Sequence, residues 1–376
     1  MSAYHQMGHD SSNLLSVKEL GAFAGAIASP VNETEDTMLS KVLKLKSDHF
    51  EIILDPQLYY PNSTRGYLTE WSYFPSDVDT ADQSNSAWWT SIINNLSDCV
   101  IRIGADAVCS PAIVPRTYSP EYHSFNLDIG VQLQDRLAGT GVDVLLTVLV
   151  PINDLADHQR SAEIASIITT ENISRVYLVF VSDIDPRREL KEVNDLIGAM
   201  QLIKDLEGAG VRVLVGCSSS DIVLWKAAGA KDCATGKFFN LRRHTSSRFE
   251  PPAGGGGQLD YWFEEALLAF LREPDLLRVK SKGLLSEASD NNPFAQKVLP
   301  TIDAGGAWRA LSWRQYLFWF ADVEGRMNRG EVTGKKLLQI ADDNWGAIED
   351  TGLLMEERRN DGQWVRSWRR ALAGLR

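Results

Sequence analysis

Residues 211–243 read VRVLVGCSSSDIVLWKAAGAKDCATGKFFNLRR, and this stretch decides the fold. The run 211–215 is apolar on both faces, which is typical of a parallel strand that helices cover. Gly216 ends the strand, and the polar run that follows offers N-cap oxygens to a helix over 222–228. A second strand is expected over 233–239. The stretch therefore predicts a strand–helix–strand unit.

The same alternation continues through the first two thirds of the chain, and it predicts a parallel sheet with crossover helices. We expect strands over 50–54, 99–104, 142–150, 175–181, 211–215 and 233–239, with helices over 87–96, 128–138, 162–169, 190–207 and 222–228. An eight-stranded barrel needs two more strands, which we expect at 67–74 and within the first forty residues. The predicted fold is an α/β, TIM-like (β/α) barrel with a helical C-terminal extension, and a doubly wound open sheet is the alternative.

The final third of the sequence differs from the rest. The segment PPAGGGGQ at 251–258 is either a surface loop or hinge, or a loop that approaches a phosphate. Helices are expected after it, over 259–271, 313–328, 335–349 and 362–375. We expect residues 1–250 to form a barrel-like catalytic domain, and residues 251–376 to form the glycine-rich loop and a helical region that packs on the barrel.

Composition indicates a globular protein. The 376 residues are 44% hydrophobic and 23% charged, which is ordinary for a folded soluble chain. The first residues, MSAYHQMGHDSS, lack the basic and apolar pattern of a secretory signal, and no apolar run is long enough to span a bilayer. Four scattered cysteines fit a reducing compartment. We expect a cytoplasmic protein with no membrane partner, and the sequence leaves its oligomeric state open.

Charge is uneven along the chain. The net charge of −12 argues against a protein that coats nucleic acid without specificity. However, Arg242, Arg243, His244 and Arg248 alternate with phenylalanines and include no acid, a pattern that suits phosphate contacts with base stacking. The terminal WVRSWRRALAGL allows the same interpretation. For that segment we favour an amphipathic helix whose tryptophans pack on the core and whose arginines face solvent.

The decisive stretch resembles the closing unit of the tRNA-guanine transglycosylase barrels. The resemblance covers about a tenth of the chain and rests on Gly216, Asp221, Gly229, Asp232 with Cys233, and Asn240 with Arg242. In that family the Asp of the Asp-Cys pair attacks the sugar C1′ and displaces a base, so the resemblance implies that Asp232 is a nucleophile or stabilises an oxocarbenium ion. The spacing to Asn-x-Arg differs, and the family's base-binding loop is missing. Its zinc cluster is missing too, because the cysteines are dispersed.

Polar residues at predicted strand ends supply further candidates, because barrels build their active sites at the carboxyl ends of strands. Asp55, Asp106, Asp183 and Ser218 each follow an apolar run. The long loop after Asp55 contains aromatic side chains that could stack on a base or sugar. We therefore expect substrate binding by these residues: Tyr59, Tyr60, Trp71, Asp106, Ser218, Asp221 and Asn240.

These features together predict cleavage of the N-glycosidic bond of a normal or modified base in nucleic acid. Asp232 would lie below C1′, Asp55 would hold the departing base, and Asp183 would be a third carboxylate for acid–base work. The base would flip out of a DNA, which we favour over a tRNA, and the basic cluster would hold the flanking phosphates. No metal or cofactor is expected. A role in defence against phage with modified DNA fits this interpretation.

Three alternatives stay open at this point. The protein could exchange a base in tRNA or DNA, as a transglycosylase does. It could be a barrel enzyme for a small phosphorylated or glycosylated molecule, which the acidic net charge favours. It could also be a noncatalytic interaction subunit that docks through its tryptophan-rich final third.

Overall fold

Eight parallel strands close into a barrel in sequence order in the computed structural model, which describes residues 3–9, 11–76, 85–251, 259–286, 291–357 and 360–375. The strands are β1 (Ala3–Gln6), β2 (Gly25–Ala28), β3 (Glu51–Leu54), β4 (Ala107–Cys109), β5 (Asp143–Pro151), β6 (Arg175–Val181), β7 (Arg212–Val215) and β8 (Asp232–Thr235). Pairing of Ala3 with Cys233 closes the ring between β1 and β8. The predicted TIM-like barrel is confirmed, and the open sheet is wrong.

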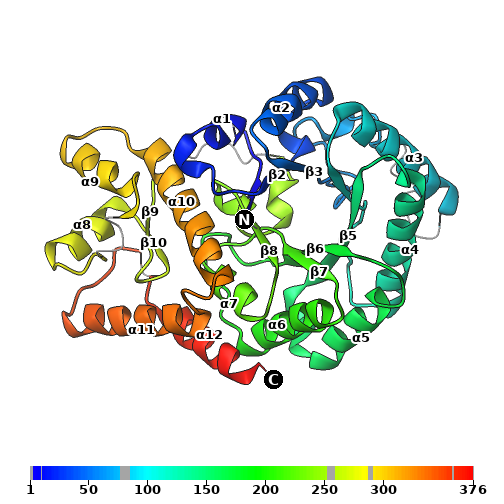
Figure 1. Cartoon of the computed structure of the whole chain (residues 1–376). Coiled ribbons are helices and arrows are strands. Elements are labelled where there is room, and N and C mark those ends of the chain that lie inside the picture. The colour runs from blue at the N-terminus through cyan, green and yellow to red at the C-terminus, as the bar shows by residue number, and fades with distance from the viewer. Residues whose placement is uncertain are drawn as a thin grey trace.

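Helices follow the first seven strands and surround the barrel (Figure 1). They are α1 (Ser11–Leu15), α2 (Glu35–Ser47), α3 (Ser86–Ile103), α4 (Pro120–Leu137), α5 (His158–Ile168), α6 (Val193–Gly208) and α7 (Ile222–Ala227). Short 3₁₀ helices lie in the connections at Lys18–Leu20, Pro30–Asn32, Leu68–Glu70, Ile152–Ala156, Phe239–Leu241 and Ser246–Arg248.

The last third both extends the barrel and completes its wall. It contains a hairpin of β9 (Trp262–Glu264) and β10 (Ala269–Leu271), then α8 (Glu273–Ser281), α9 (Ala295–Asp303), α10 (Arg309–Asn328), α11 (Gly334–Asp350) and α12 (Gln363–Gly374). Helix α10 packs against β1, β8 and α7, so it takes the place of the eighth barrel helix although it lies beyond residue 250. Figure 1 shows the other elements gathered on one side of the barrel. Residues 252–258 of the glycine-rich segment lie outside the described residues.

Three predicted elements are wrong, each because a short apolar run fits more than one element. Residues 99–104 end helix α3, where Cys99, Val100 and Ile103 lie on its buried face and Gly104 caps it with a φ of 71°. Residues 259–271 contain the β9–β10 hairpin instead of a helix, and 67–74 contain a 3₁₀ turn instead of a strand. Three barrel strands were not among the six predicted ranges: β1 and β2, which both lie within the first forty residues, and β4, which follows helix α3.

Alternate residues of each strand face the barrel interior, because side chains alternate along a strand. Ile53, Leu145, Val179, Leu214 and Ala234 belong to one buried apolar cluster inside the barrel. Residues two positions before or after them on a strand share that inward direction, so the interior has a polar layer at each end.

In the part of the chain that the structure covers, the helices are all too short or too polar to cross a membrane.

Candidate active site

Asp55 lies at the carboxyl end of the barrel, directly after β3, and points inward like Ile53 two residues earlier. Its side chain is 1% exposed. The carboxylate accepts hydrogen bonds from the Tyr59 hydroxyl at 2.8 Å and from the Gln57 backbone N–H at 3.0 Å. Burial raises the pKa of Asp55 to about 6, although these donors and Arg248 oppose the rise. Asp55 can therefore gain or lose a proton near neutral pH.

Arg248 provides a cation beside this carboxyl group. The guanidinium is buried, and its Nη2 donates to Ser29 Oγ at 2.8 Å. Ser29 Oγ in turn donates to Gln57 Oε1 at 3.0 Å. Burial lowers the pKa of Arg248, while Asp55 and the neighbouring Tyr59 favour its charged form. Arginine stays charged at neutral pH, so this guanidinium can attract an anionic group of a ligand.

His244 contributes a polar atom with no partner. Its ring contacts Tyr59 edge to face at 5.1 Å and stacks on Tyr60 at 6.2 Å between centroids. Burial and the Arg248 charge lower the pKa of His244 to about 3, so the imidazole is neutral at physiological pH. Among the described residues, nothing hydrogen-bonds to its buried Nε2. Buried nitrogens normally have a hydrogen-bond partner. Because Nε2 of His244 has none in the described chain, it can form a hydrogen bond with a ligand.

Other residues of the mouth are polar, and two of them have strained backbones. Gln6 Nε2 donates to the Tyr177 hydroxyl at 2.7 Å, and Gln6 Oε1 accepts from the Cys217 backbone N–H at 3.0 Å. Gln57 and Cys217 adopt φ values of 54° and 52°. Side chains other than glycine rarely occupy this left-handed region, and residues that do so are concentrated at functional sites.

The chain itself covers this cluster. The segment 237–250 crosses the mouth, where the His244 carbonyl accepts from Ser182 N–H at 3.3 Å and the Phe249 carbonyl accepts from Ser63 Oγ at 2.6 Å. His244 is 3% exposed and Arg248 is 7% exposed. A cavity of about 350 Å³ lies on the outer side of the segment and is lined by Lys237, Asn240 and Trp313 among others. The segment therefore shields Asp55, which is 1% exposed, from solvent.

The structure brings some of the sequence-predicted residues together and separates others. Asp55, Tyr59, Tyr60, His244 and Arg248 share the mouth. The exposed Asp183, at the end of β6, lies close enough to influence Tyr60. Ser218 is buried after β7 and is occupied by hydrogen bonds to the backbone, from its N–H to Ala234 O and from its Oγ to Val215 O.

Asp232 lies at the opposite end of the barrel. It is the first residue of β8, and its fully buried carboxylate forms two hydrogen bonds with Arg212, at 2.5 and 2.8 Å. Ala234, two residues later, already faces the apolar centre, so the barrel core separates Asp232 from Asp55. The predicted partnership of these two carboxylates at one sugar does not occur.

Asp106 and Trp71 also lie away from the mouth. Asp106 precedes β4, because the run before it is helical, and its carboxylate accepts the Ile52 N–H at 2.8 Å and pairs with Lys46 at 2.7 Å. Trp71 is buried beside Tyr73 and donates from Nε1 to the Glu33 carbonyl at 2.9 Å. It anchors the loop and offers no face to a ligand.

The predicted phosphate-binding arginines are inside the protein. Arg242 lies 3.7 Å from the centroid of the Tyr316 ring and donates to the Gly236 carbonyl. Arg243 pairs with Asp221 at 3.5 Å and with Glu189 at 3.3 Å. Both arginines are 3% exposed, so they do not present a phosphate-binding surface. Asn240 is exposed and lines the 350 Å³ cavity.

Sequence reasoning missed part of the mouth: Gln6, Ser29, Gln57, Tyr177 and Cys217. Gln6 and Tyr177 are polar or aromatic residues at inward-facing positions of strands, which is the signal that could have found them. For Gln6 this signal could not be used, because β1 was not predicted and its inward-facing positions were therefore not known. Within the described ranges, no three His, Cys, Asp or Glu side chains are grouped so that they could hold a metal ion.

No family model matches the sequence, and no curated protein matches it. Among solved structures, the chain is similar to the citrate synthase SbnG, with 10% identity over 62% of this chain and 85% of that chain, at a TM-score of 0.37. It is similar to an L-ribulose 3-epimerase, with 11% identity over 62% and 80% of the two chains, at a TM-score of 0.37. It is also similar to an AP endonuclease, family 2, from Brucella melitensis, with 10% identity over 65% of this chain and 94% of that chain, at a TM-score of 0.38.

The resemblance to the tRNA-guanine transglycosylase barrels is wrong. No family model supports the motif. Asp232, on which the resemblance depends, is bound to Arg212 at the amino end of the barrel.

Proposed function

We propose that this chain is an enzyme that transfers protons on a small hydroxylated molecule carrying an anionic group. The observation that carries the proposal is Asp55, a buried carboxyl group at the carboxyl end of the barrel with a pKa of about 6. General acid–base groups work best when their pKa lies near the working pH.

Each neighbour of Asp55 has a role in this proposal. Asp55 accepts a proton from a C–H next to a carbonyl, or from an O–H, and returns it at another atom, so no further reactant is needed. Neutral His244 hydrogen-bonds the substrate oxygen on which charge develops. Arg248 attracts the anionic group, and Gln6, Gln57 and other polar side chains of the mouth bind hydroxyls.

We do not retain the narrower hypothesis of base excision from nucleic acid. It needed Asp232 at the reacting carbon and Arg242 with Arg243 on phosphates, but the first lies at the other end of the barrel and the others are buried. The covered mouth also suits a small molecule better than a polymer. Defence against phage, which followed from the same hypothesis, has no residue left to support it.

A noncatalytic interaction protein is the second candidate. The observation in its favour is that segment 237–250 fills the mouth and buries His244 and Arg248. In that case the polar mouth would hold the segment in place and bind no substrate.

Thermal stability and proton exchange separate the two candidates. The wild-type chain is incubated with matched neutral and anionic compounds, such as ribose and ribose 5-phosphate, and with hydroxy acids. We expect an anionic compound to raise Tm, and we expect Arg248→Met to abolish that rise. In D2O, nuclear magnetic resonance should detect deuterium entering a C–H of the compound that binds.

Asp55→Asn should slow this exchange about 100-fold or more, and the wild-type rate should change with a pKa of about 6. Asp232→Asn is the matched control, because it removes a buried carboxylate at the other end of the barrel. If no compound raises Tm and no exchange occurs, the noncatalytic candidate is the better one.

A further inference from the structure

A second cavity lies on the outside of the barrel, away from the mouth. Its volume is about 870 Å³, and it is formed where α7, the turn between α10 and α11, and α12 meet. Helix α7 leads directly to the start of β8, so the cavity lies near the amino end of the barrel. A volume of this size is typical of pockets for small molecules, about 300–1,000 Å³.

Helices α11 and α12, which line this cavity, pack tightly against the rest of the protein. A Cβ on Gly334 would lie 2.4 Å from the Val223 carbonyl oxygen and 3.1 Å from Ala227 Cβ. Glycine therefore lets the first turn of α11 contact α7. Trp368 is fully buried and donates from Nε1 to the Leu190 carbonyl at 2.6 Å, which fixes α12 against the barrel. The cavity thus has firm walls on both sides.

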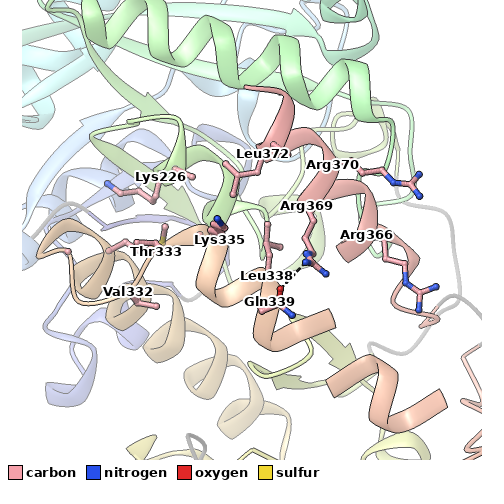
Figure 2. Close-up of a pocket in the computed structure, with 15 residues that line it drawn as sticks. Lys226, Val332, Thr333, Lys335, Leu338, Gln339, Arg366, Arg369, Arg370 and Leu372 are labelled. Carbon is pink, nitrogen blue, oxygen red and sulfur yellow. Dashed lines mark hydrogen bonds between the residues drawn. The ribbon is translucent and has the colours of Figure 1, made fainter. Parts of the chain in front are cut away.

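Apolar side chains and cations line the cavity together. Met327, Val332 and Leu372 supply apolar surface, and Figure 2 shows Leu372 and the fully buried Leu338 beside Lys335. The fifteen lining residues include five cations and no carboxylate, although the chain carries a net charge of −12. The five are Lys226, Lys335, Arg366, Arg369 and Arg370.

Only part of this positive charge is neutralised. Lys226 pairs with Glu324 at 3.5 Å, Arg366 pairs with Glu349 at 3.0 Å, and Arg369 pairs with Asp342. Lys335 and Arg370 are exposed and make no ion pair with any residue that the structure describes. Figure 2 shows Arg370 extending outward from α12, so it lies at the rim, while Lys335 lies inside.

We propose that this cavity binds a small anionic amphiphile, a molecule with a carboxylate or phosphate head and an apolar body. The head pairs with Lys335, with Arg370 adding attraction at the rim, and the body covers Met327, Val332 and Leu372. Burial of the apolar body gives affinity, and the unpaired cations select the charge. The sequence WVRSWRRALAGL, which packs its tryptophans inward as expected, thereby also supplies a ligand-binding face.

Calorimetric titration of the full chain with three matched probes tests the proposal. Octanoate has both charge and tail, octanol has the tail alone, and acetate has the charge alone. We expect octanoate to bind at least 10-fold more tightly than either of the others. Octyl phosphate, titrated in parallel, distinguishes a phosphate head from a carboxylate head.

Two variants locate the binding. The double variant Lys335→Glu with Arg370→Glu should weaken octanoate binding at least 10-fold without changing Tm, because both side chains are exposed. Lys44→Glu with Arg116→Glu changes the net charge equally at exposed positions elsewhere and should have no effect. Leu372→Gln should weaken octanoate binding several-fold. Leu354→Gln is its control and should not change binding, because Leu354 is 84% exposed and does not line the cavity.

Equal affinity for octanol and octanoate would overturn the proposal, and so would unchanged binding in the double variant. Sedimentation velocity tests the remaining possibility, that a second copy of the chain occupies the cavity. A dimer of the wild-type chain that the double variant abolishes would show that a second copy fills the cavity instead.

Discussion

Each end of the barrel interior has a buried carboxyl group, Asp232 at the amino end and Asp55 at the carboxyl end. The two differ in whether an arginine pairs with the carboxylate. At the amino end Arg175 binds Glu51 at 2.8 Å and Asp143 at 2.9 Å, and Arg212 holds Asp232. At the carboxyl end Asp55 makes no ion pair with any described residue, and its donors are a hydroxyl and amides. Ion pairs fix a charge, whereas a buried carboxyl without one titrates near neutral pH. The first end is suited to stability and the second to chemistry.

Removing the central cation of the amino end should have the largest effect on stability. Arg175→Met leaves Glu51 and Asp143 without their cation and removes a partner of the Tyr4–Glu51 hydrogen-bonded pair. Breaking a buried ion pair costs about 3–5 kcal/mol, and partial exposure of both acids reduces this to about 2–4 kcal/mol here. The urea midpoint measures the loss.

Arg136→Met is the control for this variant. Arg136 pairs with Asp98 at 3.4 Å, both side chains are at least half exposed, and such a pair contributes less than about 0.5 kcal/mol. A loss in Arg175→Met no larger than that of the control would contradict the structural role of the amino end.

The pH dependence of stability should reveal Asp55 itself. Its pKa in the folded chain, about 6, lies above the ordinary value of 3.8, so the folded state binds the proton more tightly than the unfolded state. The contribution of Asp55 to the free energy of unfolding is therefore highest below pH 4 and falls as pH rises to about 6. The fall amounts to about 2–3 kcal/mol.

Asp55→Asn removes this fall, so the variant should gain stability relative to wild type between pH 4 and pH 7. Chemical denaturation of both proteins across that range measures the difference and cancels the other titrating groups. Tyr59→Phe is the matched variant, because loss of the hydroxyl that donates to the carboxylate should move the fall to higher pH. A pH-independent difference between Asp55→Asn and wild type would mean that Asp55 does not titrate in this range.

The sequence predicted the fold better than it predicted the site. Alternating strands and helices identified the barrel, and Asp55 was placed at a strand end correctly because the run EIIL does form β3 and Asp55 directly follows it. Asp106 was misplaced because VIRIG, read as a strand, closes an 18-residue helix, and this error moved its carboxylate from one end of the barrel to the other. Strand direction and boundary decide which end a residue occupies, and short apolar runs leave both ambiguous.

The basic cluster shows a different limit. Arg243 has its acidic partners at Glu189 and Asp221, and Arg242 has its aromatic partner at Tyr316, all outside the cluster itself. A local window that contains no acid therefore looked like a surface for phosphates. Only the tertiary fold supplies the partners that allow these guanidinium groups to be buried.

Asp232→Asn should have the smallest of these effects on stability. It also tests directly which end of the barrel is the reactive one. The substitution weakens the two hydrogen bonds to Arg212, but that arginine is 43% exposed and water can replace the lost partner, so we expect a loss of about 1–2 kcal/mol. Ligand-induced stabilisation and deuterium exchange at the mouth should be unchanged, because the apolar core lies between Asp232 and Asp55. If the variant kept its urea midpoint but lost exchange, the amino end would be the reactive one and the assignment of the two ends would be reversed.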